Sequence, residues 1–209
     1  MTDDPYRFIA GWYDRLFEPI NSGLRVLGLR LFIPKKGMAL LDVGCGTGLH
    51  LDLYRKYQCA LYGIDPSPSM LEIAQKRLGD AAKLHLGDAS DMPYEDEYFD
   101  LVIAMLALHE MRPATRSAVV QEMKRVLKPS GHMLLIDFHP GPIRPLQGWW
   151  TKLIITLSEI AAGREHFRNY RQFMAIKGLP SLISEHRLAV EKKRMVSGGA
   201  LAAFLLTTQ

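Results

Sequence analysis

Short apolar runs alternate with amphipathic, helix-like stretches over most of the chain. Five of these runs are six to eight residues long and predict buried strands, at residues 38–43, 59–65, 83–88, 99–106 and 132–138. Strands that are apolar along their whole length and separated by helices are typical of crossover units. The pattern therefore predicts an α/β protein whose parallel sheet is covered on both faces.

Helix start and stop signals lie between these runs. Ser67 is a favourable N-cap, and Pro68 follows it in the first turn, where proline is tolerated best. Pro113 can open a later helix, which Pro129 and Gly131 would end. These signals agree with the hydrophobic pattern about where the helices lie.

The pattern changes in residues 140–187, which contain no strand-like run. Helices are predicted at 147–162 and 164–177, followed by strands at about 187–197 and 200–208. Gly198-Gly199 lies between the last two strands and is a strong hairpin signal. The chain is therefore expected to add an antiparallel hairpin to the parallel sheet.

Composition places the chain among ordinary globular domains. It has 209 residues, of which 48% are hydrophobic and 23% charged, as expected for one domain. The two cysteines are too few for a disulfide framework and have no metal-ligand neighbours, so no metal site is expected. The N-terminus has no signal-peptide pattern, and Lys152 and Glu159 interrupt the longest apolar stretch. We therefore expect a cytoplasmic protein.

The net charge of +4 is unevenly distributed. Residues 1–105 contain 11 basic and 15 acidic residues, whereas residues 106–209 contain 15 basic and 7 acidic ones. The excess indicates either solvated helix faces or attraction for an anionic substrate or a membrane surface. It is not interleaved with a row of aromatic residues, so no nucleic-acid partner is expected. The pattern indicates no particular oligomeric state.

The strongest motif is the glycine-rich segment Asp42 to Gly48, which follows a strand and opens a helix. Glycines let the backbone approach a ligand, and the helix start offers free N–H donors. A nicotinamide fingerprint would need its third glycine where Leu49 stands. An acid such as Asp42 is unfavourable beside a pyrophosphate but suits a ligand that carries an ammonium group. No Lys-Ser/Thr pair follows, which excludes a P-loop.

Acidic residues follow two of the neighbouring strands. Asp65 ends the second strand, where a carboxylate can accept both ribose hydroxyls of a nucleoside, and Asp88 ends the third. Because the carboxyl ends of parallel strands share one edge of a sheet, these acids would flank a single crevice. Each acid alone could equally cap the loop that follows it.

Four segments resemble successive motifs of one family: LDVGCGTG, YGIDPSPSM, LGDASDMPYEDEYFD and RVLKPSGHMLLIDF. They are similar to those of class I S-adenosylmethionine (SAM)-dependent methyltransferases, especially the ubiquinone/menaquinone-biosynthesis-like group (methyltransferase domain type 11). The resemblance runs from about Tyr13 to the C-terminus and is loosest at 140–187. It implies SAM as cofactor and a Rossmann-like, doubly wound seven-stranded sheet of order 3-2-1-4-5-7-6.

The same resemblance divides a single methyltransferase domain into four parts. They are an N-terminal helical cap (1–37), a SAM-binding core (38–139), a helical substrate or lid insertion (140–187) and a terminal hairpin (188–209). In that family the glycine loop holds the methionine part of SAM, the residue at Asp65 the ribose, and those at Asp88 and Ala89 the adenine. The implied cofactor-binding set is Tyr13, Asp42, Gly44, Gly46, Gly48, Asp65, Pro66, Met70, Asp88, Ala89 and Met105.

Candidate catalytic residues are His109, His166 and Tyr170. Methyl transfer is an in-line displacement, so a base is needed only if the acceptor must lose a proton. His109 follows the fourth strand and is either a structural histidine or that base. His166, Tyr170 and Phe173 are spaced i, i+4 and i+7, so they share a helix face that either packs in the core or lines the substrate pocket.

The expected function is methyl transfer from SAM to a small-molecule acceptor, aromatic or lipid-like. Two alternatives remain at this stage: a nicotinamide-dependent oxidoreductase on a related scaffold, and a non-catalytic SAM-binding module. Trp149 and Trp150 begin an apolar helix face that either packs on the sheet as a lid or contacts a lipid-like substrate or membrane surface.

Overall fold

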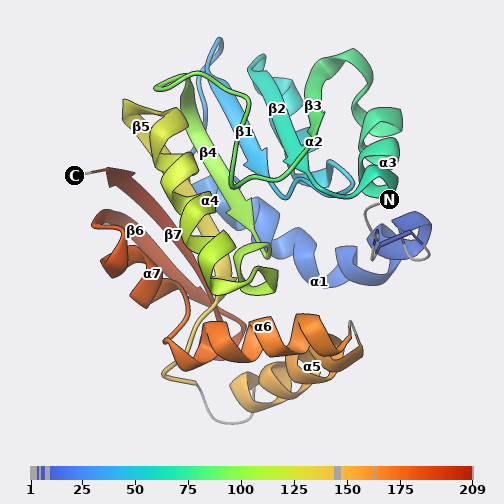
Figure 1. Cartoon of the computed structure of the whole chain (residues 1–209), viewed down its shortest axis with the longest axis vertical. Coiled ribbons are helices and arrows are strands. Elements are labelled where there is room, and N and C mark those ends of the chain that lie inside the picture. The colour runs from blue at the N-terminus through green and yellow to red at the C-terminus, as the bar shows by residue number, and fades with distance from the viewer. Residues whose placement is uncertain (1–3, 5, 8–9, 144–146, 162, 209) are drawn as a thin grey trace.

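The computed structural model describes residues 4, 6–7, 10–143, 147–161 and 163–208. Its centre is a seven-stranded sheet of order β3-β2-β1-β4-β5-β7-β6, which confirms the predicted α/β fold and strand order (Figure 1). The strands are β1 (Ala39–Val43), β2 (Ala60–Asp65), β3 (Ala82–Leu86), β4 (Phe99–Met105), β5 (Leu127–Phe138), β6 (Leu188–Val196) and β7 (Leu201–Thr208).

Parallel pairing joins the first five strands, and the terminal hairpin adds the two antiparallel ones. β1 lies between β2 and β4 and is buried along its whole length. β7 runs antiparallel to both β5 and β6, as the glycine pair in the hairpin predicted. The carboxyl ends of β1, β2 and β4 therefore meet at one edge of the sheet, where open α/β sheets bind their ligands.

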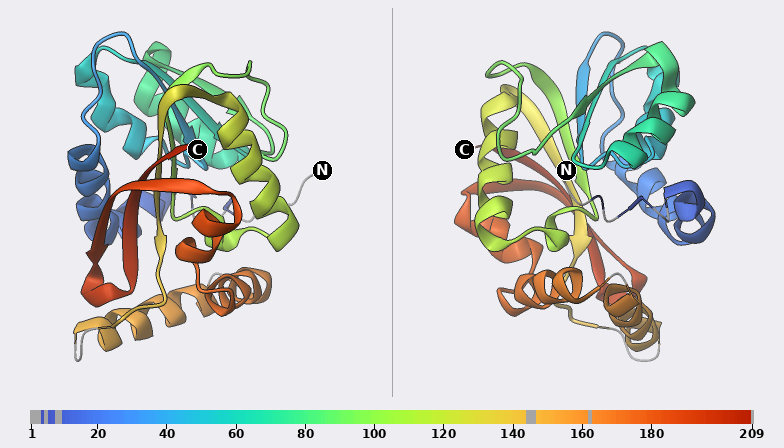
Figure 2. Two further views of the ribbon diagram at one scale, coloured as in Figure 1. Left: turned by 90° about the vertical axis from the view of Figure 1, so that its left-hand side faces the viewer. Right: turned by 45° about the vertical axis from the view of Figure 1, so that its right-hand side comes forward.

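Helices cover both faces of the sheet. They are α1 (Ala10–Leu31), α2 (Leu49–Tyr54), α3 (Pro68–Leu78), α4 (Pro113–Val126), α5 (Gln147–Ala161), α6 (Arg164–Ala175) and α7 (Leu179–Glu185). Figure 2 shows α1 on one side of the sheet and α4 and α7 on the other, while α5 and α6 cross beyond its end. The two helices of the insertion thus cover the carboxyl edge of β4 and β5.

A local sequence signal accounts for the start of α3, whereas β5 and α7 differ from the prediction. The Ser67 hydroxyl accepts a hydrogen bond from the Met70 N–H at 3.2 Å, so the predicted N-cap is confirmed. β5 begins at Leu127 rather than at residue 132, because Leu127 pairs with Phe99 across an irregular register. α7 was not predicted: the hydrophobic pattern gave no helix between residue 177 and the last two strands, whereas Pro180 occupies the first turn of one.

One face of α5 is exposed rather than packed on the sheet. Trp149 and Trp150 are 70% and 64% exposed, and Leu153, Ile154 and Leu157 are also exposed. The interpretation of this face as a packed lid is therefore wrong. Among the helices in the described ranges, none combines the length and hydropathy needed to cross a membrane.

Candidate functional site

The glycine loop between β1 and α2 has three residues in the left-handed region. The φ angles of Gly44, Gly46 and Gly48 are +72°, +53° and +77°. A Cβ at Gly44 would lie 2.8 Å from the Ala107 Cβ, and one at Gly48 would lie 2.8 Å from a Leu78 methyl group. At Gly46 no atom lies within 4 Å of that position. Two of the glycines therefore allow close packing, and the third borders open space.

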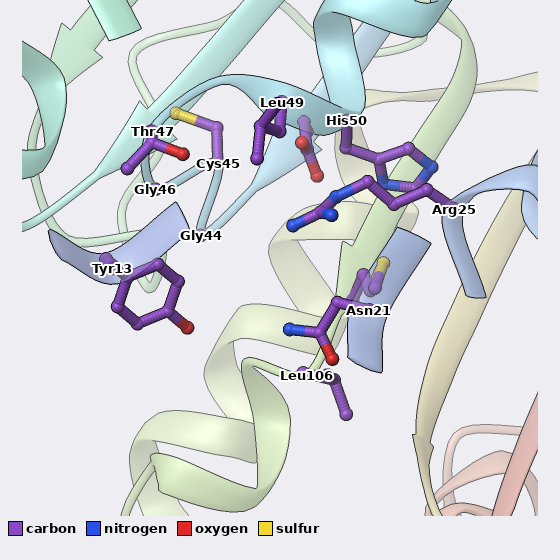
Figure 3. Close-up of a pocket in the computed structure, with 12 residues that line it drawn as sticks. Tyr13, Asn21, Arg25, Gly44, Cys45, Gly46, Thr47, Leu49, His50 and Leu106 are labelled. Carbon is purple, nitrogen blue, oxygen red and sulfur yellow. The ribbon is translucent and has the colours of Figure 1, made fainter. Parts of the chain in front are cut away.

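A pocket opens beside this loop (Figure 3). Three elements line it: the loop with the start of α2, the end of β4, and α1. Tyr13 extends into it from one side, and Arg25 and Asn21 from the other. Its lining residues are Tyr13, Asn21, Arg25, Asp42, Gly44, Cys45, Gly46, Thr47, Leu49, His50, Met105 and Leu106.

Asp65 joins the end of β2 to the glycine loop. One carboxylate oxygen accepts the Gly46 N–H at 2.8 Å, and the other accepts the Ser67 N–H at 2.9 Å. Burial raises the pKa of Asp65, although these two donors act against the rise. Each carboxylate oxygen can accept a further hydrogen bond, so the residue is equipped to hold a diol.

Asp42 is a buried acid at the base of the pocket. Burial raises its pKa well above the usual range, and the positive charge of Arg25 opposes that rise. The Arg25 guanidinium is itself paired with Glu18. Arg25 and Asn21 were not predicted, because polar residues on an N-terminal helix look like ordinary solvent-facing positions.

α1 is fastened to the glycine loop through Asp14. The Thr47 hydroxyl donates to one Asp14 oxygen at 2.5 Å. Arg77 of α3 donates both to the other Asp14 oxygen and to the Thr47 carbonyl. The Tyr13-Asp14 segment therefore lies directly over the loop, and Asp14 holds it there.

The remaining predicted cofactor residues occupy different environments. Met105 lines the pocket, at the end of β4. Asp88 is exposed and accepts a backbone N–H two residues ahead at 2.8 Å, while Ala89 is buried. Pro66 is exposed, and the Met70 side chain is buried in the core outside the pocket. The backbone N–H of Met70 therefore serves the Ser67 cap, and its buried side chain does not line the pocket.

A second group of polar residues lies past the end of β4. The His109 Nδ1 is 2.8 Å from an oxygen of Asp137, and both residues are buried. The other Asp137 oxygen accepts the N–H groups of Leu108 and His109. Burial alone would lower the pKa of His109, but the charge and hydrogen bond of Asp137, with Glu159 and Glu110, raise it to about 10. Asp137 was missed, although it follows the same pattern of an acid near a strand end.

The structure brings the three candidate catalytic residues together. The His109 ring centroid lies 5.8 Å from that of His166 and 6.4 Å from that of Tyr170. Phe173, on the same face of α6, packs instead in the core. The Arg116 Cζ atom lies over the Phe173 ring, 4.7 Å from its centroid. The helix face is thus divided between the core and this polar group.

Aromatic residues near the N-terminus connect the two groups. The Tyr6 hydroxyl donates to Glu110 at 2.7 Å, next to His109. The Tyr6 ring packs edge-on against Tyr13, with centroids 5.9 Å apart. The polar group that contains His109 therefore adjoins the pocket over the glycine loop.

Comparisons with known proteins identify relatives of this chain. Residues 41–135 match the family model described as "Methyltransferase domain". An uncharacterized methyltransferase from Synechocystis sp. is 32% identical over 168 residues, which cover 79% of this chain and 73% of that protein. A demethylmenaquinone methyltransferase from Desulfitobacterium hafniense is 28% identical, covering 96% and 87%. The crystal structure of a SAM-dependent methyltransferase from Aquifex aeolicus shares the fold, with a TM-score of 0.66, 18% identity and full coverage of both chains.

Proposed function

The chain belongs to the class I SAM-dependent methyltransferases of the ubiquinone/menaquinone-like group, and we propose that its acceptor is a small, quinone-like molecule. Membership of this family removes the nicotinamide-dependent alternative, as the position of Leu49 had suggested. A relative named as a demethylmenaquinone methyltransferase supports a quinone-like acceptor. The observation that carries the proposal is the convergence of His109, His166 and Tyr170 beside the pocket.

The residues of the pocket fit SAM. Gly46 borders open space beside the glycine loop, and a side chain at this position would fill that space. Asp65 can accept further hydrogen bonds, as the ribose hydroxyls require. The buried Asp42 supplies carboxyl oxygens that can accept hydrogen bonds from an ammonium group. When bound, SAM supplies an electrophilic methyl group on a sulfonium. Tyr13 and Asp14 cover the loop and exclude water from this side.

The polar group past β4 offers hydrogen-bonding side chains to an oxygen of the acceptor. With a pKa of about 10, the His109 ring keeps its proton at neutral pH, so it is a poor proton acceptor there. A hydrogen bond to a phenolate or enolate oxygen holds the acceptor in place, and the negative charge on that oxygen makes the neighbouring ring carbon nucleophilic. We therefore propose that His109, His166 and Tyr170 bind and orient a reduced, ionised quinone ring.

The exposed face of α5 supports an acceptor with an apolar tail. Trp149 and Trp150 lie on this face, and Lys152 is exposed on the same helix. Apolar and basic side chains on one helix favour contact with an anionic membrane surface, from which such an acceptor could be taken. Flotation with anionic vesicles tests this contact, and protein confined to the lipid-free fraction would contradict it.

Transfer of label from methyl-labelled SAM tests the acceptor class. Reduced demethylated naphthoquinols, with and without a prenyl tail, should become methylated, whereas fatty acids and peptides should not. H166A and Y170F should lower turnover at least tenfold with SAM affinity retained. H132A is the matched control, because His132 also contacts a glutamate but pairs with Leu101 near the amino end of β4, away from the pocket. SAM binding without transfer to any reduced quinone would refute the proposed acceptor.

A further inference from the structure

Three potential metal ligands converge from separate elements beside the pocket. His109 follows β4, Glu159 is on α5, and His166 is on α6. Each offers one ligand atom, and these atoms all lie within 4.8 Å of one another. The side chains of His109, Glu159 and His166 are 3%, 8% and 20% exposed. A buried group of two imidazoles and a carboxylate is a recurring ligand set for transition metals.

Two of the separations between these donors are close to the edge length of a coordination tetrahedron. The His109 Nε2 lies 3.5 Å from one Glu159 oxygen, and the His166 Nε2 lies 3.3 Å from the other. Metal–donor bonds of about 2.0–2.1 Å place neighbouring tetrahedral donors roughly 3.3–3.4 Å apart. An N–H···O hydrogen bond usually spans about 2.7–3.2 Å, so both observed separations are longer than such a bond.

One donor atom makes no hydrogen bond, although the His166 Nε2 lies 3.3 Å from it. The Oε2 atom of Glu159 is buried and accepts no hydrogen bond. A buried carboxylate oxygen with no partner is costly in a folded protein. A cation between Glu159, His109 and His166 would satisfy it.

Surrounding groups already orient the donors. Asp137 binds the Nδ1 of His109, so the Nε2 faces Glu159, as in the carboxylate–histidine pairs that support metal ligands. Tyr6 binds one oxygen of Glu110, and the other lies 3.4 Å from the His166 Nε2 and 3.9 Å from the His109 Nε2. Glu110 therefore adjoins both imidazoles.

We propose that His109, Glu159 and His166 form a binding site for a divalent transition metal ion, Zn²⁺. The ion would join the end of β4 to both helices of the insertion. Sequence spacing gave no sign of the site, because the ligands come from three distant segments. The ion would replace the Nε2 protons of His109 and His166, so in the loaded protein Tyr170 and the ion would face the acceptor in their place.

Metal titration tests the proposal without an assay of activity. Protein stripped with a chelator should bind one Zn²⁺ per chain, measured by competition with a chromogenic chelator, and its thermal midpoint should rise. Co²⁺ should give the visible bands of a tetrahedral site. H166A should weaken Zn²⁺ binding at least 100-fold, because it removes one of three ligands from a partly exposed position where folding should survive.

Two controls separate the outcomes. H132A removes a histidine 2.8 Å from the carboxylate of Glu191, a comparable surface pair, and should leave Zn²⁺ affinity unchanged. SAM binding in the same samples reports whether the pocket is intact. Folded protein that binds SAM but no stoichiometric Zn²⁺, or H166A that binds as tightly as the wild type, would overturn the metal site and leave the proposed acceptor standing.

Discussion

The carboxylate of Asp65 accepts the backbone N–H of Gly46 at 2.8 Å, so the acid assigned to the ribose also shapes the loop assigned to the methionine end of SAM. Its second oxygen accepts the Ser67 N–H at the start of α3. One side chain thus couples β2, the glycine loop and α3. The cofactor site is therefore held together by a residue that would also bind the ligand.

D65N should weaken SAM binding about 10- to 100-fold, since charge-assisted hydrogen bonds contribute about 1.5–3 kcal/mol. The amide keeps the size of the side chain but loses the charge and half of the acceptor capacity. Titration calorimetry measures the effect. D100N is the control, because Asp100 lies at the start of β4 and binds Lys128 away from the pocket. Equal affinity in D65N and the wild type would contradict the assignment.

Asp14 should act on the lifetime of the complex. D14A removes the acceptor of the Thr47 hydroxyl and of Arg77, so α1 should separate more readily from the loop. We expect SAM to dissociate about 5- to 20-fold faster, corresponding to a loss of roughly 1–2 kcal/mol. Stopped-flow displacement measures this rate. E72A, which breaks an exposed ion pair with Lys76 on α3, should have no effect.

His50 should make stability sensitive to acid. Burial, with the nearby charge of Arg25, lowers the pKa of His50 to about 3, and neither ring nitrogen has a hydrogen-bond partner. The unfolded chain therefore takes up a proton near pH 6.5 while the folded chain does not. Above about pH 6.5 the neutral His50 ring does not lower the free energy of unfolding. As the pH falls from 6.5 toward 3, the free energy of unfolding decreases by up to about 1.4 kcal/mol per pH unit.

H50F keeps an aromatic ring at this position and removes the titration. Urea unfolding at several pH values should show that the free energy of unfolding falls less steeply below pH 6.5 in H50F than in the wild type. The difference between the two slopes is the informative quantity, because acidic residues contribute equally to both proteins. Parallel slopes would show that His50 does not remain neutral.

The fold was predictable where local signals agreed with the hydrophobic pattern. The Ser67 cap and the Gly198-Gly199 hairpin are encoded within a few residues, and both were located correctly. The start of β5 was not, because its first residues extend the strand only through pairing of Leu127 with Phe99. Such pairing depends on distant segments that no local pattern specifies.

The residues of the candidate site also fall into two classes: those that a local sequence pattern reveals and those that only the tertiary structure brings together. The glycine loop and Asp65 stand out because their chemistry depends on spacing along the chain. Glu159 did not, since a single acid in an apolar helix reads only as an interruption of that stretch. Its proximity to His109 exists because α5 crosses the end of β4, which is a property of the tertiary structure.

Gly44 and Gly46 should respond differently to an added methyl group. Both have positive φ angles, so alanine at either position should cost about 1–2 kcal/mol of backbone strain. Only at Gly44 would the new Cβ also collide, 2.8 Å from the Ala107 Cβ. G44A should therefore lower the free energy of unfolding more than G46A, as measured by urea denaturation.

Removing the Ala107 methyl group tests this reasoning directly. The G44A/A107G double variant should recover part of the stability lost in G44A, whereas A107G should not rescue G46A, because the Cβ position of Gly46 is open. G46A should instead lose SAM affinity, since its methyl group would occupy the cradle. G23A, at an open position within α1, controls for a general effect of alanine. Additive energies in the G44A/A107G cycle would show that the two residues are not in contact, and the packing of the loop against the end of β4 would have to be revised.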